Sequence, residues 1–302
     1  MNQAYLGRAR NELTEYIVYG NLSRRERNPA NRALLEKLSA QEHKHYEFWK
    51  SALENESGAD RGAIEQAIQP YRWSLITIPF LRTIFGVTFT TKFLETHEKN
   101  AIATYQAMLP NLPEPLRKRL EEIIEDEKTH EQSLIGGLKE KRVSYIGFIA
   151  LGLADAIVEI TGVHAGFLGV TGSTLIAGVS GVIVGFAAAI SMGSAAYIQA
   201  KQDTERSPIA SGFTTWASYF GSVILLALPY FFIRTMITAF TTSTLVGLTL
   251  LATFTFYGAI IFDRKFSREF TESGSLMLGT ALLTYILGNI IGGIFHLTPS
   301  NF

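Results

Sequence analysis

The sequence contains no cysteine among its 302 residues. This absence excludes both a disulfide framework and a metal site with thiolate ligands. Any bound metal ion must therefore have oxygen and nitrogen ligands. The first residues, MNQAYLGRARNELTEY, also lack the apolar stretch that precedes the cleavage site of a signal peptide. We therefore expect the N-terminal half to stay in the cytoplasm.

Charge is scarce in the second half of the chain. Residues 143–302 carry 13 of the 54 Lys, Arg, Asp and Glu side chains. Acidic and basic residues are equal in number, and no strongly basic segment indicates binding to nucleic acid. The uneven distribution predicts two domains in different surroundings, residues 1–142 and residues 143–302.

The second half has five stretches of about 20 or more mostly apolar residues, the length that a helix needs to cross a bilayer. They are 143–167, 173–200, 212–233, 236–261 and 274–297. Basic residues favour the cytoplasmic side. The loops after the second and fourth stretches hold more of them than the other loops, so we predict a cytoplasmic N-terminus and an external C-terminus. The second stretch is followed by Lys201 and Arg206, the third by Arg234, and the fourth by Arg264, Lys265 and Arg268.

The first apolar stretch contains ionisable residues where the others have none. Asp155 and Glu159 are four residues apart and share a helix face. Each charged group at the bilayer centre costs about 2.5–3.5 kcal/mol, so we predict that they line a polar path. The alternative to a polar path is that these acids are buried and only form hydrogen bonds to neighbouring helices. His164 is interpreted as a packing or interfacial residue, and Met192 as either a thioether ligand or apolar filler, with filler favoured.

The N-terminal half contains an internal repeat. AQEHKHYEFW and EDEKTHEQ both contain Glu-x-x-His, which places the two side chains on one helix face. Each motif follows another glutamate by 29 or 30 residues, and each of those glutamates precedes a tyrosine by seven. The pattern predicts two helical hairpins related by an approximate two-fold axis. We expect helices at about 3–26, 30–56, 90–109 and 114–140.

Packing these four helices together would gather a set of metal-binding side chains. The set is Glu12, Glu42, His45, Glu98, Glu127 and His130. Four carboxylates and two imidazoles suit a pair of iron or manganese ions in a four-helix bundle. Glu15 and Glu95, one turn from Glu12 and Glu98, are rival or additional ligands that spacing cannot exclude. The alternative is a charged helical protein with chance spacings.

The segment 71–94, YRWSLITIPFLRTIFGVTFTTKFL, links the two predicted hairpins and is too apolar for an exposed loop. A sixth span here would separate the two halves of the metal site. We therefore predict a crossover on the membrane surface, with Trp73, Phe80 and Phe85 facing lipid and Arg82 at the headgroups.

Two known families resemble these halves. NELTEYIVYGNLSRRE, AQEHKHYEFW, FLETHEKNAIATY and EDEKTHEQ resemble a rubrerythrin-type, ferritin-like domain. GLADAIVEITG and AGVSGVIVGFAAAISMGSAAYIQAKQDTE resemble the first two spans of the vacuolar iron transporter family. The organisation is similar to that of bacterial membrane-bound ferritins. The resemblance implies an all-α protein with a four-helix ferritin-like bundle followed by a five-helix transmembrane domain.

The resemblance also implies a function. It places Asp155 and Met192 on an ion path, where the transporter family has an aspartate and a methionine. It implies export of Fe²⁺, with Mn²⁺ as an alternative, from the cytoplasm across the plasma (inner) membrane in exchange for protons. The short KQDTERSPIAS stands where eukaryotic members have a metal-binding insert, so the bundle would capture or oxidise the ion instead.

Other interpretations remain open. A homodimer is implied by the resemblance and favoured by the small residues of 178–196, which need a close-packed neighbour. We assign no catalytic residue, although the bundle is a candidate ferroxidase. The second interpretation is a membrane-anchored di-iron oxidase, and a third is a tethered iron store or sensor. The acids of the first span favour transport, because an anchor has no need of them.

Overall fold

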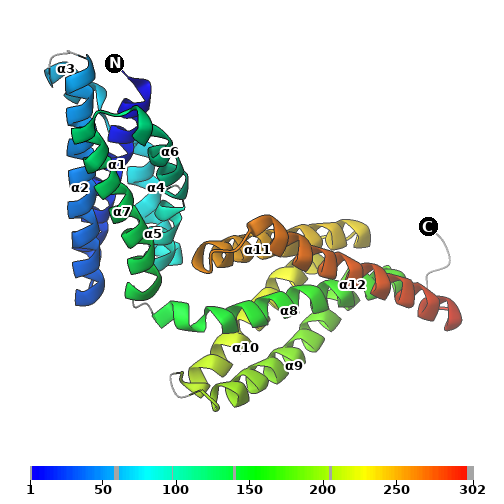
Figure 1. Cartoon of the computed structure of the whole chain (residues 1–302). Helices are drawn as coiled ribbons and strands as arrows, with labels where there is room; N and C mark the ends of the chain where they lie inside the picture. The colour runs from blue at the N-terminus through cyan, green and yellow to red at the C-terminus, as the bar shows by residue number, and fades with distance from the viewer. Residues whose placement is uncertain (1, 58–60, 97, 139–140, 204–205, 298–302) are drawn as a thin grey trace. The chain divides into compact units, whose positions relative to one another are not determined.

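The computed structural model describes residues 2–57, 61–96, 98–138, 141–203 and 206–297, except for the side chains of 57, 98–100, 111, 131–137 and 141–142. The chain forms two compact units, Met1–Glu140 and Lys141–Phe302. Helices make up the regular structure of the described residues, which contain no strand (Figure 1). The predicted all-α fold is confirmed.

The N-terminal unit is built on a pair of long helices, α1 (Gln3–Arg25) and α2 (Pro29–Ser57), which pack along each other. Asn28 causes the predicted turn between them, because its side chain accepts hydrogen bonds from the amides of Ala30 and Asn31. Proline is favoured in the first turn of a helix, and Pro29 begins α2. A third long helix, α7 (Glu114–Gly137), packs against α2.

The helix predicted at 90–109 is divided in the structure. It consists of α5 (Val87–Glu95) and α6 (Glu98–Met108), and both contact α7. Residues 87–91 and Leu94 are buried in this unit, so the second half of 71–94 is part of the bundle and differs from the predicted surface crossover. Short helices α3 (Arg61–Ala67) and η1 (Leu109–Asn111) complete the connections.

Helix α4 (Arg72–Phe85) occupies the first half of that segment and lies parallel to α1. Gly86 ends it with a φ of 91°, a backbone conformation that favours glycine. The Tyr71 amide donates to Thr14 Oγ1 at one end of the pair. At the other end, Arg82 donates to the Arg25 carbonyl and to Glu26. Arg82 therefore fastens α4 to α1, which differs from its predicted place at lipid headgroups.

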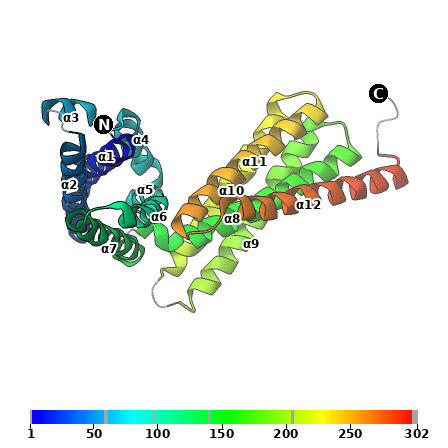
Figure 2. The ribbon, with the colours of Figure 1, turned by 45° about the horizontal axis from the view of Figure 1, so that its top comes forward.

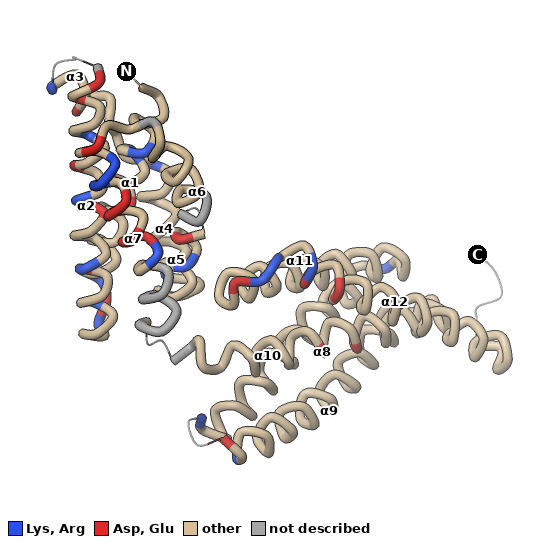
Figure 3. The backbone as a smooth tube through the Cα atoms, viewed as in Figure 1, with Lys and Arg blue, Asp and Glu red and all other residues tan. Residues whose placement is uncertain are grey.

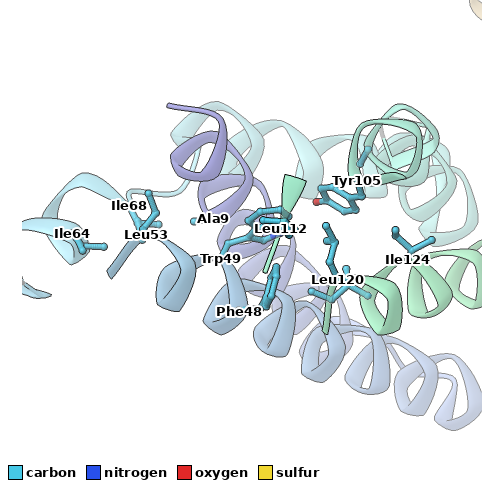
Figure 4. Packing of buried hydrophobic residues seen from close by; sticks show 12 residues of the cluster. Ala9, Phe48, Trp49, Leu53, Ile64, Ile68, Tyr105, Leu112, Leu120 and Ile124 are labelled. Atoms are coloured by element: carbon cyan, nitrogen blue, oxygen red, sulfur yellow. The ribbon is translucent and has the colours of Figure 1, made fainter. Parts of the chain in front are cut away.

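The core of the N-terminal unit consists of two apolar clusters. One contains Trp49, Phe48 and Tyr105, which converge from α2 and α6 (Figure 4). The other contains Val18 and Leu22 of α1 and residues from α2, α4 and α5. Along α1 and α2, the sequence positions of the predicted metal ligands fall between these clusters. The polar side chains are thus enclosed by apolar packing on both sides.

The C-terminal unit contains the five predicted spans. They are α8 (Lys141–Val170), α9 (Thr174–Ala200), α10 (Pro208–Phe232), α11 (Met236–Ile261) and α12 (Phe266–Ile294). All five are long and apolar enough to cross a membrane, and the chain is an integral membrane protein. Helix α8 contacts each of the other four, so it is the central helix (Figure 2). Among the described residues of this unit, Lys and Arg occur only near the ends of the helices and in the loops between them (Figure 3).

Two of these helices begin earlier than predicted. Helix α10 begins at Pro208 because the side chain of Ser207 accepts from the amide of Ala210, a standard N-terminal cap. Helix α12 begins at Phe266 and includes the charged Arg268 in its first turn, where Arg268 pairs with Glu272. An apolar stretch predicts the part of a helix that spans the bilayer. It does not predict the polar turns by which α10 and α12 extend beyond that part.

The small residues of α9 have a different role from the one predicted. Gly178, Gly181, Gly185, Ala189 and Gly193 are buried, and α9 packs against α10 and α8 of the same chain. The close-packed neighbour that these residues require is therefore within the protomer. The small-residue face of 178–196 no longer supports a homodimer.

Candidate metal centre

A cluster of buried ligand side chains lies in the N-terminal unit. Glu12 of α1, Glu42 and His45 of α2, and Glu127 of α7 each offer one ligand atom, and these atoms lie within 4.8 Å of one another. All four residues are buried. The Glu-x-x-His spacing works as predicted, because residues three apart on α2 share the inner face of the helix. This group could hold a metal ion.

The two Glu-x-x-His motifs are interleaved around a common centre. Glu42 has one oxygen 3.3 Å from His45 Nδ1 and the other 3.2 Å from His130 Nδ1. Glu127 has the same relation to both imidazoles, at 3.2 Å and 3.5 Å. The two rings have centroids 5.8 Å apart. Each carboxylate thus reaches toward both imidazoles, the arrangement of a ligand that bridges two cations.

The hydrogen bonding of the cluster fits a metal centre. Within the described part of the chain, both oxygens of Glu42 and both ring nitrogens of His45 and His130 are buried without a hydrogen-bond partner. Buried polar groups are almost always paired, and unpaired ones are costly. A set of oxygen and imidazole ligands suits iron, manganese or zinc better than magnesium. Cations placed between these atoms would satisfy them.

Without metal, protons hold the cluster together. Burial raises the pKa of the Glu12 carboxyl to about 8. Burial also opposes charge on Glu42 and Glu127, but the adjacent imidazoles outweigh this effect and lower the pKa of both carboxyls. Burial disfavours the charged form of His130, yet Glu127 and Glu42 raise its pKa to about 10. Metal binding must therefore displace protons from Glu12 and from the imidazoles.

Two tyrosines support the carboxylates across the repeat. Tyr105 Oη donates to Glu12 Oε1 at 2.6 Å, and Tyr19 Oη donates to Glu95 Oε1 at 2.6 Å. Each tyrosine therefore bonds a carboxylate from the other half of the repeat. In the sequence both tyrosines are recognisable only as markers of the repeat, and their role as hydrogen-bond donors was not predicted. Their equal spacing from Glu12 and Glu98 was the available signal.

The structure distinguishes the candidate ligands that spacing left open. Glu12 belongs to the four-residue group, whereas Glu15 is half-buried one turn further along α1. Burial and then the charge of Glu42 raise the pKa of Glu15 well above its usual value. Glu95 is buried and bonded to Tyr19. The side chain of Glu98 lies outside the described residues.

Asp126 is a neighbour of the cluster that sequence reasoning missed. Its Oδ2 lies 3.5 Å from His45 Nε2, on the side of the ring away from the glutamates. Gln41 donates to the other oxygen of Asp126 at 3.3 Å. A carboxylate behind a histidine commonly orients a ligand imidazole. Its position beside Glu127 was the only signal in the sequence.

The acids of the first span lie in the middle of α8. Asp155 and Glu159 are both half-buried, one turn apart. Tyr219 of α10 donates a hydrogen bond to Glu159 Oε2. Tyr219 was not predicted, because no sequence pattern relates α10 to α8 across the 60 residues between Glu159 and Tyr219. Glu159 also lines a cleft of about 460 Å³ with Gly162 and Gly166 of α8 and Thr284 of α12.

The remaining residues singled out in the spans lie in apolar surroundings. Met192 packs against the cluster that contains Ala156 and Ile157, which follow Asp155 on α8. His164 is fully buried, and its ring centroid lies 4.1 Å from that of Tyr230. Neither ring nitrogen of His164 has a hydrogen-bond partner among the described residues. The packing or interfacial role of His164 and the choice between thioether ligand and filler for Met192 stay predictions.

No family model matches this sequence, and neither the curated proteins nor the solved structures include a match. The site's geometry is therefore the basis for any functional conclusion.

Proposed function

We propose that the chain is a metal-ion transporter that exports Fe²⁺, with Mn²⁺ as a second cargo, from the cytoplasm across the plasma (inner) membrane in exchange for protons. In this proposal the N-terminal unit is a rubrerythrin-type, ferritin-like bundle that captures the ion. The C-terminal unit is a transmembrane domain of the vacuolar iron transporter type.

The geometry of Glu42 and Glu127 is the observation that supports a two-metal bundle. Each carboxylate lies between His45 and His130 with one oxygen near each ring. Such a pair bridges two divalent ions and balances their charge. Glu12 completes the position beside His45, where its Oε2 lies 3.6 Å from Nδ1. By symmetry, we expect Glu95 or Glu98 to be the ligand beside His130.

Iron bound between these residues would supply one-electron chemistry with oxygen, which is the basis for ferroxidase activity. The chain's own contribution is to hold the ions in a layer closed by apolar side chains and to release protons as they bind. Tyr105 and Tyr19 keep Glu12 and Glu95 in fixed orientations.

The acids of α8 favour transport over simple anchoring. Ionisable side chains within spans are costly, and when present they usually mark ion paths or proton relays. Asp155 and Glu159 stand on one face of the helix that contacts every other span. An anionic oxygen there can replace the water of a divalent ion, and it can take up a proton after the ion leaves.

Metal flux tests the proposal. Purified full-length protein is reconstituted in liposomes, and Fe²⁺ entry is measured with an internal chelating dye, with and without an acidic lumen. Transport in exchange for protons predicts faster Fe²⁺ entry with the acidic lumen, together with alkalinisation of the lumen. Two bound metal ions without flux would instead favour the membrane-anchored di-iron oxidase.

Orientation and assembly are also part of the proposal. Five spans and the distribution of basic loop residues predict that the N-terminal unit is cytoplasmic and the C-terminus external. Reporters at both ends test this. The cleft beside Glu159 opens between α8 and α12, and a second subunit of a homodimer would close it. A monomer in several mild detergents would contradict the homodimer.

A further inference from the structure

Helix α4 is apolar on two opposite faces. Its inner face, with Leu75 and Ile78, packs against α1. Its outer face carries Trp73, Ile76, Phe80 and Ile84, which are 76%, 73%, 64% and 50% exposed. At 3.6 residues per turn, these four positions form one continuous stripe along the helix. We call this stripe the α4 outer face.

The α4 outer face is unusual for a surface of this unit. Single exposed apolar residues are common, but a contiguous patch of large ones marks an interaction surface. Helix α4 has 14 residues, about 21 Å at 1.5 Å per residue, which is too short to cross a bilayer core of about 30 Å. The face therefore suits a surface contact and cannot be a span.

Basic residues flank this face. Arg25 is exposed at the end of α1 and lines a small hollow with Leu75, Ile78 and Pro79 of α4. Arg72 is exposed at the start of α4. Apolar side chains bordered by arginines are typical of a helix that lies in the interface of an anionic bilayer. Tryptophan, here Trp73, is enriched at that depth.

We propose that the α4 outer face docks on the headgroup region of an anionic bilayer, the membrane that the chain's own helices cross. The tether supports this choice of partner. Helix α7 ends at Gly137 and α8 begins at Lys141, so a short connection keeps the N-terminal unit at high effective concentration near the bilayer.

A second copy of the chain fits this face less well. A two-fold contact would place the same patch against itself. The basic residues at both ends of α4 would then face each other, while the stripe offers no acidic residue to pair with them. Anionic lipid satisfies the arginines and the apolar side chains together.

Site-specific fluorescence tests the proposal in the full-length protein. Because the chain has no cysteine, Ile76→Cys and Phe80→Cys each give one labelling site for a bimane fluorophore. Lys44→Cys, exposed on α2, is the matched control. Each variant is placed in nanodiscs of phosphatidylcholine and phosphatidylglycerol. Quenching is measured with spin-labelled lipid and with aqueous iodide.

Docking predicts that lipid quenching is stronger at positions 76 and 80 than at position 44. Iodide quenching should be several-fold weaker at positions 76 and 80 than at position 44. Adding Trp73→Glu and Ile84→Glu to the Phe80→Cys chain should restore iodide access, with the bound metal unchanged. Iodide quenching at position 76 equal to that at position 44 would overturn the proposal. So would shielding from both quenchers, which would indicate a second copy.

The role of the arginines in binding anionic lipid is tested separately. In nanodiscs of phosphatidylcholine alone, lipid quenching at position 76 should fall, and equal quenching there would overturn the role given to Arg25 and Arg72. The measurement requires no metal flux. Its failure is therefore distinguishable from failure of the transport proposal.

Discussion

Tyr105 and Glu12 are joined by a hydrogen bond of 2.6 Å although they lie 93 positions apart in the chain. Tyr19 and Glu95 form the counterpart, also at 2.6 Å. The two halves of the repeat thus exchange tyrosine–carboxylate bonds across the bundle. This exchange links α1 to α5 and α6, and it includes Glu12 of the candidate metal centre.

Tyr105→Phe should weaken both the fold and the metal centre. The change removes the donor to a buried carboxyl, which costs about 1–3 kcal/mol in the free energy of unfolding. Loss of a group that orients a ligand typically lowers metal affinity by about 10–100-fold. Thermal melts and metal titrations of the full chain measure both effects. Tyr16→Phe, at an exposed site on α1, is the control. Equal metal affinity in the two variants would contradict a supporting role for Tyr105.

Glu42→Gln should reduce the bound Fe²⁺ from two ions per chain to at most one. The amide preserves the size of the side chain, but it removes the negative charge that lies between His45 and His130. Elemental analysis of anaerobically loaded protein gives the stoichiometry. Glu47→Gln, on the exposed side of α2, should retain both ions. Two ions in the Glu42 variant would mean that Glu42 is not a bridging ligand.

The metal-free protein should lose stability as pH rises. In the folded state the pKa of His130 is about 10, above its unfolded value of about 6.5. Its contribution is therefore fully present below pH 6.5 and is lost between pH 6.5 and 10. The pKa of Glu12 is raised to about 8 in the folded state. The contribution of Glu12 to the free energy of unfolding is therefore also lost as the pH rises, from about pH 4.5 to pH 8. Melting temperatures with a chelator measure this slope. Glu12→Gln should make the melting temperature depend less on pH between about pH 4.5 and 8. A melting temperature that rises with pH would contradict the proton-held cluster.

Metal should reverse this trend, because binding requires the deprotonated ligands. The apparent Fe²⁺ affinity should increase from pH 6 to 8, with protons released on binding. Anaerobic calorimetry in two buffers of different ionisation enthalpy counts those protons. No proton release would mean that the ions bind elsewhere.

The sequence predicted those parts that depend on local periodicity. Residue spacing was enough to predict the inner face of α2 and the five apolar helices, apart from the polar first turns of α10 and α12. Contacts between distant segments were not predictable in this way. The division between α5 and α6, the bond from Tyr219 to Glu159 and the covering of the α9 glycines by α10 all depend on tertiary packing. Arg82 illustrates the difference, because its partners Arg25 and Glu26 are distant in sequence.

Tyr219→Phe should slow Fe²⁺ flux by about 10–100-fold, the usual effect of removing a group that orients an ion ligand. The phenol donates to Glu159, and without it the carboxylate loses its fixed orientation. Metal binding by the N-terminal unit should not change. Tyr285→Phe, at an exposed site on α12, is the control. Equal flux in the two variants would show that Tyr219 serves only packing.

Transport through α8 is the central claim, and Asp155→Asn tests it most directly. The amide preserves the packing of the half-buried side chain but removes its charge and its capacity to exchange an ion for a proton. Fe²⁺ entry into liposomes is measured for this variant and for the wild type across a range of lumen pH. We predict loss of flux and of its pH dependence, with two metal ions still bound per chain. Flux at the wild-type rate with the same pH dependence would contradict the transport mechanism.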